Sequence, residues 1–207
     1  MKRIAVACLA VLCAAALGPE AWASGKSIKA GFSLARIHES STVPLPFKWS
    51  GLTFVTGGLG FESGLGLASL QLEFLYVQMG GKFDADAANG LTNRYHYIQV
   101  PVQLKVSLMP MGPLRPFVSA GGYGAYLVRA ESAIKVDNVT TKANVTSDYD
   151  RWDWGVLGGA GLAFKLPVLT VTVEARYNFG LANILASPVA GDTIKNRCWM
   201  ALVGLSY

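Results

Sequence analysis

The stretch RYHYIQVPVQLKVSLMP, residues 94–110, carries the main evidence for the fold. Every second residue from His96 to Leu108 reads His, Ile, Val, Val, Leu, Val, Leu, and the residues between them read Tyr, Gln, Pro, Gln, Lys, Ser. Successive side chains of a strand point to opposite faces, so strict alternation predicts a long strand with one apolar and one polar face. The apolar face must meet either a protein core or lipid.

Similar alternating runs recur along the chain and predict eight strands. The strands are expected near residues 27–37, 51–62, 67–80, 95–108, 116–130, 151–165, 169–181 and 195–207. Long polar connections at 38–50, 81–94, 131–150 and 182–194 alternate with short ones, rich in Gly or Pro, at 63–66, 109–115 and 166–168. This alternation is typical of an up-and-down meander, and in outer-membrane barrels the short turns face the periplasm.

Residues 1–23 differ from the rest and predict a cleaved signal peptide, followed by a barrel domain at 24–207. The basic MKR precedes the apolar run IAVACLAVLCAAALG, and Ala21-Trp22-Ala23 has the small-x-small pattern of a cleavage site. A retained N-terminal anchor is the alternative. Cleavage removes Cys8 and Cys13, so Cys198 would remain alone and an intramolecular disulfide is excluded.

The composition suits strands and tight turns. The chain has 207 residues with 23 glycines, 11% aromatic residues and only 15% charged residues. Beyond the leader, no segment has the roughly 18 consecutive apolar residues of a transmembrane helix. The formal net charge of +5 is spread along the chain without a basic patch interleaved with aromatics, which argues against nucleic acid as a partner.

The aromatic residues favour lipid over a protein core as the environment of the apolar face. A soluble, lipocalin-like barrel points its apolar face inward, whereas a membrane barrel points it outward. On the predicted apolar faces the aromatic residues gather toward strand ends, which the meander places at two levels. Amphipathic rings at two levels are typical of the interfacial girdles of a membrane barrel. The predicted girdle comprises Phe74, Tyr76, Trp152, Trp154, Phe164, Tyr177, Phe179, Trp199 and Tyr207.

The polar faces would then line the lumen. Charge is expensive in lipid but tolerable in a narrow interior when it is paired. The sequence therefore predicts a lumenal network of ion pairs and hydrogen bonds, with Gly155, Gly159 and Gly161 making room for large neighbours. Its expected members are Glu73, Lys105, Asp153, Glu174 and Arg176. Pro101 would delete a ladder hydrogen bond in mid-strand and predicts a bulge.

The residues give little support for chemistry. The chain has two histidines, His38 and His96, and a lipid esterase needs a serine activated by a positioned histidine. Two distant histidines and one cysteine make no metal-ligand spacing, and no phosphate-binding glycine motif occurs. We therefore expect no enzyme activity, no metal and no cofactor. The interior of an eight-stranded barrel is filled by side chains, which argues against a general diffusion pore.

Several blocks resemble the PorT-like family of small bacterial outer-membrane barrels, which share the eight-stranded architecture of the OmpA/OmpX type. The blocks are QLEFLYVQMGGKF, YIQVPVQLKV, RPFVSAGGYGAYL, WDWGVLGGAGLAFKL and VTVEARYNFGLANI. The C-terminal alternation from Trp199 to Tyr207 resembles the aromatic signal read by the barrel assembly machinery. The resemblance implies the barrel architecture, and it also implies an accessory role in protein secretion, which is the role of the family's namesake.

Together these observations predict an all-β protein, an eight-stranded antiparallel up-and-down transmembrane β-barrel in the outer membrane of a diderm bacterium. Its expected role is structural or binding, through extracellular loops or a periplasmic partner. The expected partners are the lipid bilayer, lipopolysaccharide and the assembly machinery; the sequence identifies no protein partner. The alternatives are a secretion accessory, a soluble periplasmic ligand-binding barrel, and an outer-membrane lipid esterase.

Overall fold

In a computed structural model, the chain is described over residues 25–40, 50–65, 67–84, 89–109, 111–137, 139–185 and 193–207. The predicted signal peptide lies outside these residues. The described residues form nine strands: β1 (Lys26–Ser40), β2 (Ser50–Leu65), β3 (Ala68–Asp84), β4 (Gly90–Ser107), β5 (Leu114–Val136), β6 (Val139–Asn144), β7 (Trp152–Lys165), β8 (Thr170–Gly180) and β9 (Thr193–Ser206). A short 3-10 helix, η2, spans Thr146–Asp148. No helix in the described part of the chain is long and apolar enough to cross a membrane.

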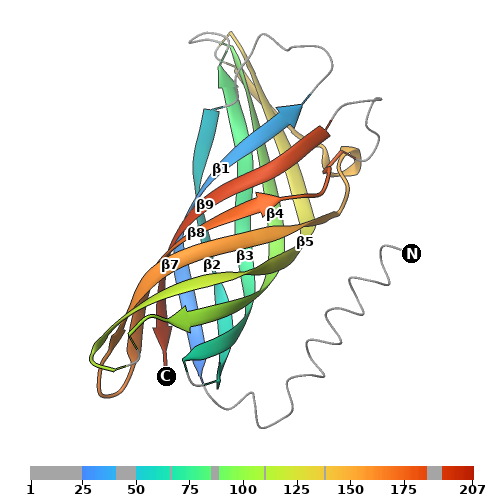
Figure 1. The fold of residues 1–207 in the computed structure, drawn as a ribbon. Coiled ribbons are helices and arrows are strands. Elements are labelled where there is room, and N and C mark those ends of the chain that lie inside the picture. Colours follow the sequence, from blue (N-terminus) through green and yellow to red (C-terminus); the bar gives the residue numbers. More distant parts are fainter. Residues whose placement is uncertain are drawn as a thin grey trace.

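Eight of the strands close into a ring (Figure 1). Each pairs antiparallel with its neighbour from β1 to β5, then β5 pairs with β7, β7 with β8, and β8 with β9. The last strand pairs with the first, in a register that runs from Ser27–Ser206 to Ser40–Thr193. The predicted eight-stranded antiparallel up-and-down barrel is therefore confirmed.

The two ends of the barrel differ. At the turn end, short connections join β2 to β3, β4 to β5 and β7 to β8, and the C-terminus lies there as well. At the loop end, the chain passes from β1 to β2, β3 to β4, β5 to β7 and β8 to β9. The connection expected at 81–94 is mostly strand, because β3 and β4 stay paired up to Asp84 and Gly90. Part of the one expected at 131–150 extends β5 and adds β6 beside it.

The alternation in β4 settles the question raised by its sequence. Tyr95, Tyr97, Gln99, Gln103 and Lys105 are buried inside the barrel. The opposite set, which includes Ile98 and Leu104, is partly or fully exposed on the outside. The apolar face of this strand therefore forms barrel exterior.

The pairing register of β4 is irregular, but not at Pro101. The prediction of a bulge at Pro101 is wrong: the pairs Leu72–Val102 and Leu75–Gln99 flank it in one continuous register with β3. The register shift lies between His96 and Tyr97, where β5 carries the extra residue Val128. On β5 the buried positions change parity there, from Leu127 to Ala130, so the bulge reverses which face of the strand points inward.

The glycine-rich strands β2 and β5, whose faces the sequence left unassigned, also alternate. Phe54 and Thr56 on β2 and Tyr123 and Ala125 on β5 face the interior. On the outside, exposed apolar side chains from both strands continue the surface of β4. They are Val55, Leu59, Val118, Tyr126 and Val128.

The interior has two zones. Toward the turn end, the buried side chains are mostly polar or charged, and toward the loop end they are mostly apolar. The apolar zone contains Phe54, Leu75, Val77, Met79, Tyr95, Tyr97, Leu127, Leu157, Ile184, Met200 and Leu202.

Segments from two loop-end connections pack over the apolar zone and close it. Tyr149 packs edge-on against Tyr95 with ring centroids 4.9 Å apart, and their hydroxyls lie 3.0 Å apart. Tyr149 also forms a β-bridge with Leu185, next to the fully buried Ile184. We call Tyr95, Leu127, Ala130, Tyr149 and Ile184 the loop-end cap.

Candidate functional site: a charged network in the lumen

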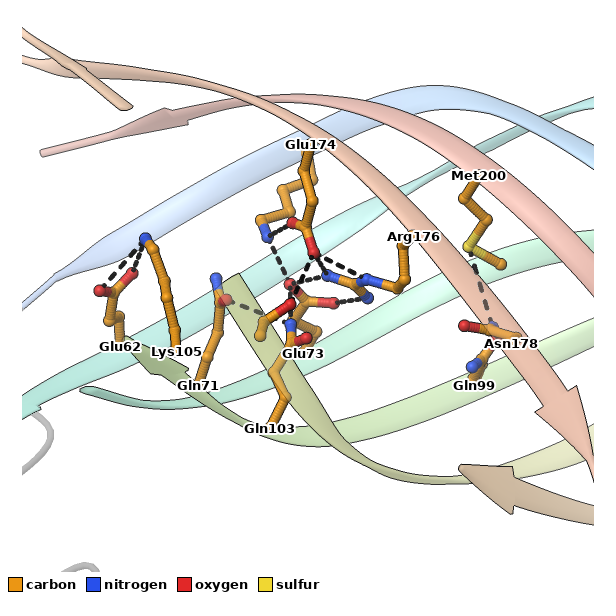
Figure 2. A network of polar contacts seen from close by, with 12 residues as sticks. Glu62, Gln71, Glu73, Gln99, Gln103, Lys105, Glu174, Arg176, Asn178 and Met200 are labelled. Carbon is orange, nitrogen blue, oxygen red and sulfur yellow. Dashed lines mark hydrogen bonds and ion pairs between the residues drawn. The ribbon is translucent and has the colours of Figure 1, made fainter. Parts of the chain in front are cut away.

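Four charged side chains from three strands meet in the middle of the barrel (Figure 2). They are Lys29 on β1, Glu73 on β3, and Glu174 and Arg176 on β8, and none is more than 4% exposed. The amine of Lys29 contacts the carboxylates of Glu73 at 2.5 Å and Glu174 at 3.0 Å. The guanidinium of Arg176 contacts Glu73 at 2.6 Å and Glu174 at 2.9 Å. We call these four residues the central ion-pair ring.

The ring is balanced in charge and spans the lumen. Two cations face two carboxylates, and each cation touches both carboxylates, so every charge of the ring is compensated within it. Strands β3 and β8 lie on opposite sides of the eight-stranded ring. The contact between Arg176 and Glu73 therefore crosses the whole interior.

Neutral groups complete the surroundings of the ring. Gln103 donates from Nε2 to Glu73 at 3.2 Å and to Gln71 at 3.1 Å. A Cβ added to Gly159 would lie 3.2 Å from Glu174 Oε1, and one added to Gly204 would lie 3.2 Å from Cγ of Lys29. The small residues on β7 and β9 thus leave room for the long charged side chains.

Lys105 belongs to a second pair nearer the turn end. Its amine lies 3.0 Å from the carboxylate of Glu62 and 4.5 Å from the ring centroid of Phe117. Ser69 donates a hydrogen bond to the same carboxylate at 2.7 Å. Lys105 and Glu73 sit on adjacent strands, as expected, but each pairs with a residue that sequence reasoning had not selected.

Asp153 lies apart from both clusters. Its Oδ2 accepts a 2.8 Å hydrogen bond from Asn196, while Oδ1 is buried without a partner. Among the described residues, no Lys or Arg lies within ion-pair distance of this carboxylate. Other polar atoms of the same part of the lumen are also buried without partners: Gln99 Nε2, Tyr123 OH and Asn178 Oδ1.

The nine predicted girdle residues all lie on the outside. Seven are exposed, and Tyr177 and Phe179 are half-buried. Trp152, Trp154, Tyr177, Phe179 and Trp199 lie toward the loop end, and Phe164 and Tyr207 lie at the turn end. Phe74 and Tyr76 lie near the middle of β3, because that strand continues to Asp84. Neighbouring rings stack in pairs, Tyr126 with Trp152 at 5.1 Å and Tyr177 with Trp199 at 4.7 Å.

Sequence reasoning missed Lys29 and Glu62. The signal for Lys29 was present, because Ser27, Lys29, Gly31 and Ser33 alternate with Ile28, Ala30, Phe32 and Leu34 in the first strand. Glu62 follows a run of glycines, which have no side chain to mark a face. The pairing of Arg176 with Glu73 across the barrel has no local signal at all.

The histidines form no hydrolytic site with a serine among the described contacts. On the outside of β4, His96 places Nδ1 2.5 Å from the hydroxyl of Tyr76. His38 lies in β1, opposite Lys195 of β9 in the register. Among the described residues, no three His, Cys, Asp or Glu side chains gather in a way that could hold a metal ion.

A closed antiparallel ring with an apolar, aromatic exterior and a charged, packed interior defines the class of outer-membrane β-barrels. The sequence matches the family described as outer membrane protein beta-barrel domain over residues 26–186, and the chain belongs to this family. A search of the curated proteins found no match. As a bacterial outer-membrane barrel, the protein contacts the lipid bilayer with its exterior, and the loop end is the extracellular end.

The chain is similar to solved outer-membrane barrels, and its likeness to the first of those named here supports the fold. The outer membrane protein OprG from Pseudomonas aeruginosa is 12% identical, with a TM-score of 0.52 over 89% of this chain and 96% of that chain. Neisserial surface protein A is 9% identical, with a TM-score of 0.49 over 88% and 97%. The N-terminal β-barrel domain of Pseudomonas aeruginosa OprF is 18% identical, with a TM-score of 0.43 over 88% and 95%. Identities this low concern the fold alone.

Proposed function

We propose that this protein is a closed outer-membrane barrel with a structural or binding role, exerted through its extracellular connections or a periplasmic partner. The observation that carries the proposal is the central ion-pair ring. Glu73 and Arg176 join opposite walls of the lumen, and Lys29 and Glu174 fill the space beside them. Since the interior of an eight-stranded barrel is only wide enough for its own side chains, a general diffusion pore is excluded from the proposal.

The free-energy cost of opening the lumen also supports a closed barrel. Passage of a solute would separate buried charges from their partners, and breaking a buried pair costs about 3–5 kcal/mol. The loop-end cap adds a second, apolar obstruction above the ring. The central ion-pair ring and the loop-end cap would have to open together for a steady ionic current to flow.

Conductance in planar lipid bilayers tests the proposal. The wild-type protein is expected to insert without a steady ionic current, next to a trimeric porin as a positive control. The double variant Glu73→Ala with Arg176→Ala removes the contact across the lumen but leaves the loop-end cap in place, so it is expected to show brief current steps without a steady current. A steady open channel in the wild-type protein would refute the closed state.

We further propose a place in the PorT-like family, with residues 1–23 as the exported leader. Four of the blocks that resemble the family carry lumenal charges: Glu73, Lys105, Asp153, and Glu174 with Arg176. A secretion accessory role predicts that deleting the gene in the native host leaves secreted proteins in the periplasm. If the deletion strain is verified to lack the barrel and still secretes normally, the proposed accessory role in secretion is refuted.

We infer that the protein does not hydrolyse lipids. The contact of His96 with a tyrosine hydroxyl, rather than with a serine, supports this inference. A phospholipid and acyl-ester hydrolysis assay on the folded protein is expected to give only background rates. Activity above background that disappears in His38→Ala or His96→Ala would show that the protein is an esterase.

A further inference from the structure

We infer that the outer surface at the loop end of β8 and β9 binds the phosphate of a lipid in the outer leaflet. The central residue is Arg197. Its sequence neighbours Asn196 and Cys198 face the lumen, at 2% and 1% exposure, so Arg197 lies on the outer side of β9. Its guanidinium carbon lies 4.7 Å from the ring centroid of Phe179.

Arg197 has an unmet need for an acceptor. Its Nε is buried and has no hydrogen-bond partner. A buried donor without a partner costs about 1–3 kcal/mol, and the planar guanidinium matches phosphate oxygens in a bidentate way. The cation–π contact with Phe179 orients the group on the barrel surface. In the part of the chain that the structure describes, no carboxylate lies within ion-pair distance of Arg197.

A second cation lies on the same side of β9. Lys195 precedes Arg197 by two residues, and the buried Asn196 between them faces the lumen, so both cations lie on the outer side of the strand. Two residues along a strand are about 6.6 Å apart, so the two positive charges repel each other. A bound anion would relieve this repulsion.

Another exposed arginine at the loop end, Arg129, is neutralised by a carboxylate of the protein, in contrast to the described surroundings of Arg197. Arg129 on β5 forms a 2.7 Å ion pair with Glu131. In the register with β4, Glu131 lies opposite Arg94. Glu131 thus supplies the negative charge beside the cations of β4 and β5.

The height of Arg197 fits the headgroup region of a membrane. Tyr177 and Trp199 stack one row closer to the middle of the barrel, and amphipathic rings sit at headgroup level. Two residues along a strand advance by about 6.6 Å, so Arg197 lies just outside those rings. Below it, the exposed side chains Leu34, Phe32 and Val203 offer an apolar surface for acyl chains.

Cations above an apolar face match a lipid with a phosphorylated headgroup, and the extracellular position assigns it to the outer leaflet. We therefore assign the phosphate of lipid A as the ligand. The site lies outside the lumen, so the conductance experiment neither supports nor weakens this inference.

Native mass spectrometry of the protein in detergent, titrated with bisphosphorylated lipid A, tests the assignment. Lys195→Gln with Arg197→Gln is expected to weaken binding at least about tenfold, the effect of losing one charge-assisted contact. Arg129→Gln is the control, because it removes one positive charge at the same end from a side chain that is already paired, and it should bind like the wild type. Dephosphorylated lipid A should bind the wild type no better than lipid A binds the double variant.

Two further arms keep the test decisive. Lys195→Glu reverses one charge and keeps Arg197 on Phe179, so it should fold and still bind more than tenfold more weakly. Excess inorganic phosphate should compete only weakly, because it lacks the acyl chains. Equal lipid A binding by the wild type and Lys195→Glu, or equal binding of the dephosphorylated lipid, would overturn the assignment.

Discussion

Arg176 on β8 reaches across the barrel to Glu73 on β3, and its two terminal nitrogens lie 2.6 and 3.0 Å from the two carboxylate oxygens. This bidentate contact joins residues 103 positions apart in the sequence. Because both side chains are fully buried, neither can exchange its partner for water when the contact is lost. The stability of the barrel should therefore depend on this pair more than on the pairs near its ends.

Glu73→Gln should be strongly destabilising. The change leaves Arg176 and Lys29 with only Glu174 to neutralise them, and removing one partner of a buried pair costs about 3–5 kcal/mol. Urea unfolding in lipid vesicles, followed by tryptophan fluorescence, measures the difference. Glu62→Gln is the control: the Glu62 side chain is 31% exposed, so this change should cost about 1 kcal/mol or less. Equal effects of the two changes would contradict the importance of the central ring.

Asp153→Asn should stabilise the folded protein. The substitution removes a buried charge that has no cation nearby among the described residues, and its amide oxygen can still accept the hydrogen bond from Asn196. Burying an uncompensated charge is costly, so a gain of about 1 kcal/mol or more is expected. Thermal unfolding on unboiled gels at neutral pH measures the shift. A lower melting temperature would indicate that the ionised carboxylate has a partner of its own.

Gly161→Ala should destabilise the barrel by overpacking. An added Cβ would clash with the backbone carbonyl oxygen of Val173 and would lie 2.5 Å from Cζ of Phe117. Forcing one methyl group into a packed core typically costs about 1–3 kcal/mol. Gly124→Ala is the matched control, because nothing lies within 4 Å of the Cβ it would add. The same urea titration should give different unfolding midpoints for the two variants. Identical midpoints would show that the barrel accommodates a methyl group at residue 161 without loss of stability.

Cys198 should be inert in the folded barrel. The thiol faces the lumen and is 1% exposed, so a membrane-permeant maleimide should label it only after heating in detergent. The mass of the denatured, labelled protein also tests the leader. Cleavage after residue 23 leaves one thiol, whereas a retained leader adds those of Cys8 and Cys13. Rapid labelling before heating would mean that the lumen is open to small molecules at this level.

The ring of strands could be predicted from the sequence because one face of each strand meets lipid and the other faces the lumen. In β4 the period-two pattern from Tyr95 to Leu108 is clear, and the structure follows it. Beyond Phe74 in β3, both faces are apolar, since Leu75 and Val77 face inward while Tyr76 faces outward. Apolar and polar residues do not alternate there, so the sequence did not predict the apolar zone of the lumen.

The partners of the charged residues were beyond prediction for a different reason. Which lumenal side chains meet depends on the stagger of strands around the ring, as with Lys29, which touches Glu73 from two strands away. Strand ends were also misjudged at the loop end. There β3, β4 and β5 remain paired through polar segments such as 81–84 and 90–94, where hydrogen bonding between strands outweighs weak local preference.

The contact between Lys29 and Glu174 has a consequence for assembly. It joins β1 to β8, residues 145 positions apart, so it can form only when the C-terminal strands have come round to meet the first strand. Before closure, Lys29 can pair only with Glu73 in the first three strands, and Arg176 only with Glu174 on its own strand. Contacts between residues so distant in sequence form late and slowly. Closure of the seam therefore joins two half-networks, each with one cation and one carboxylate, into the complete ring.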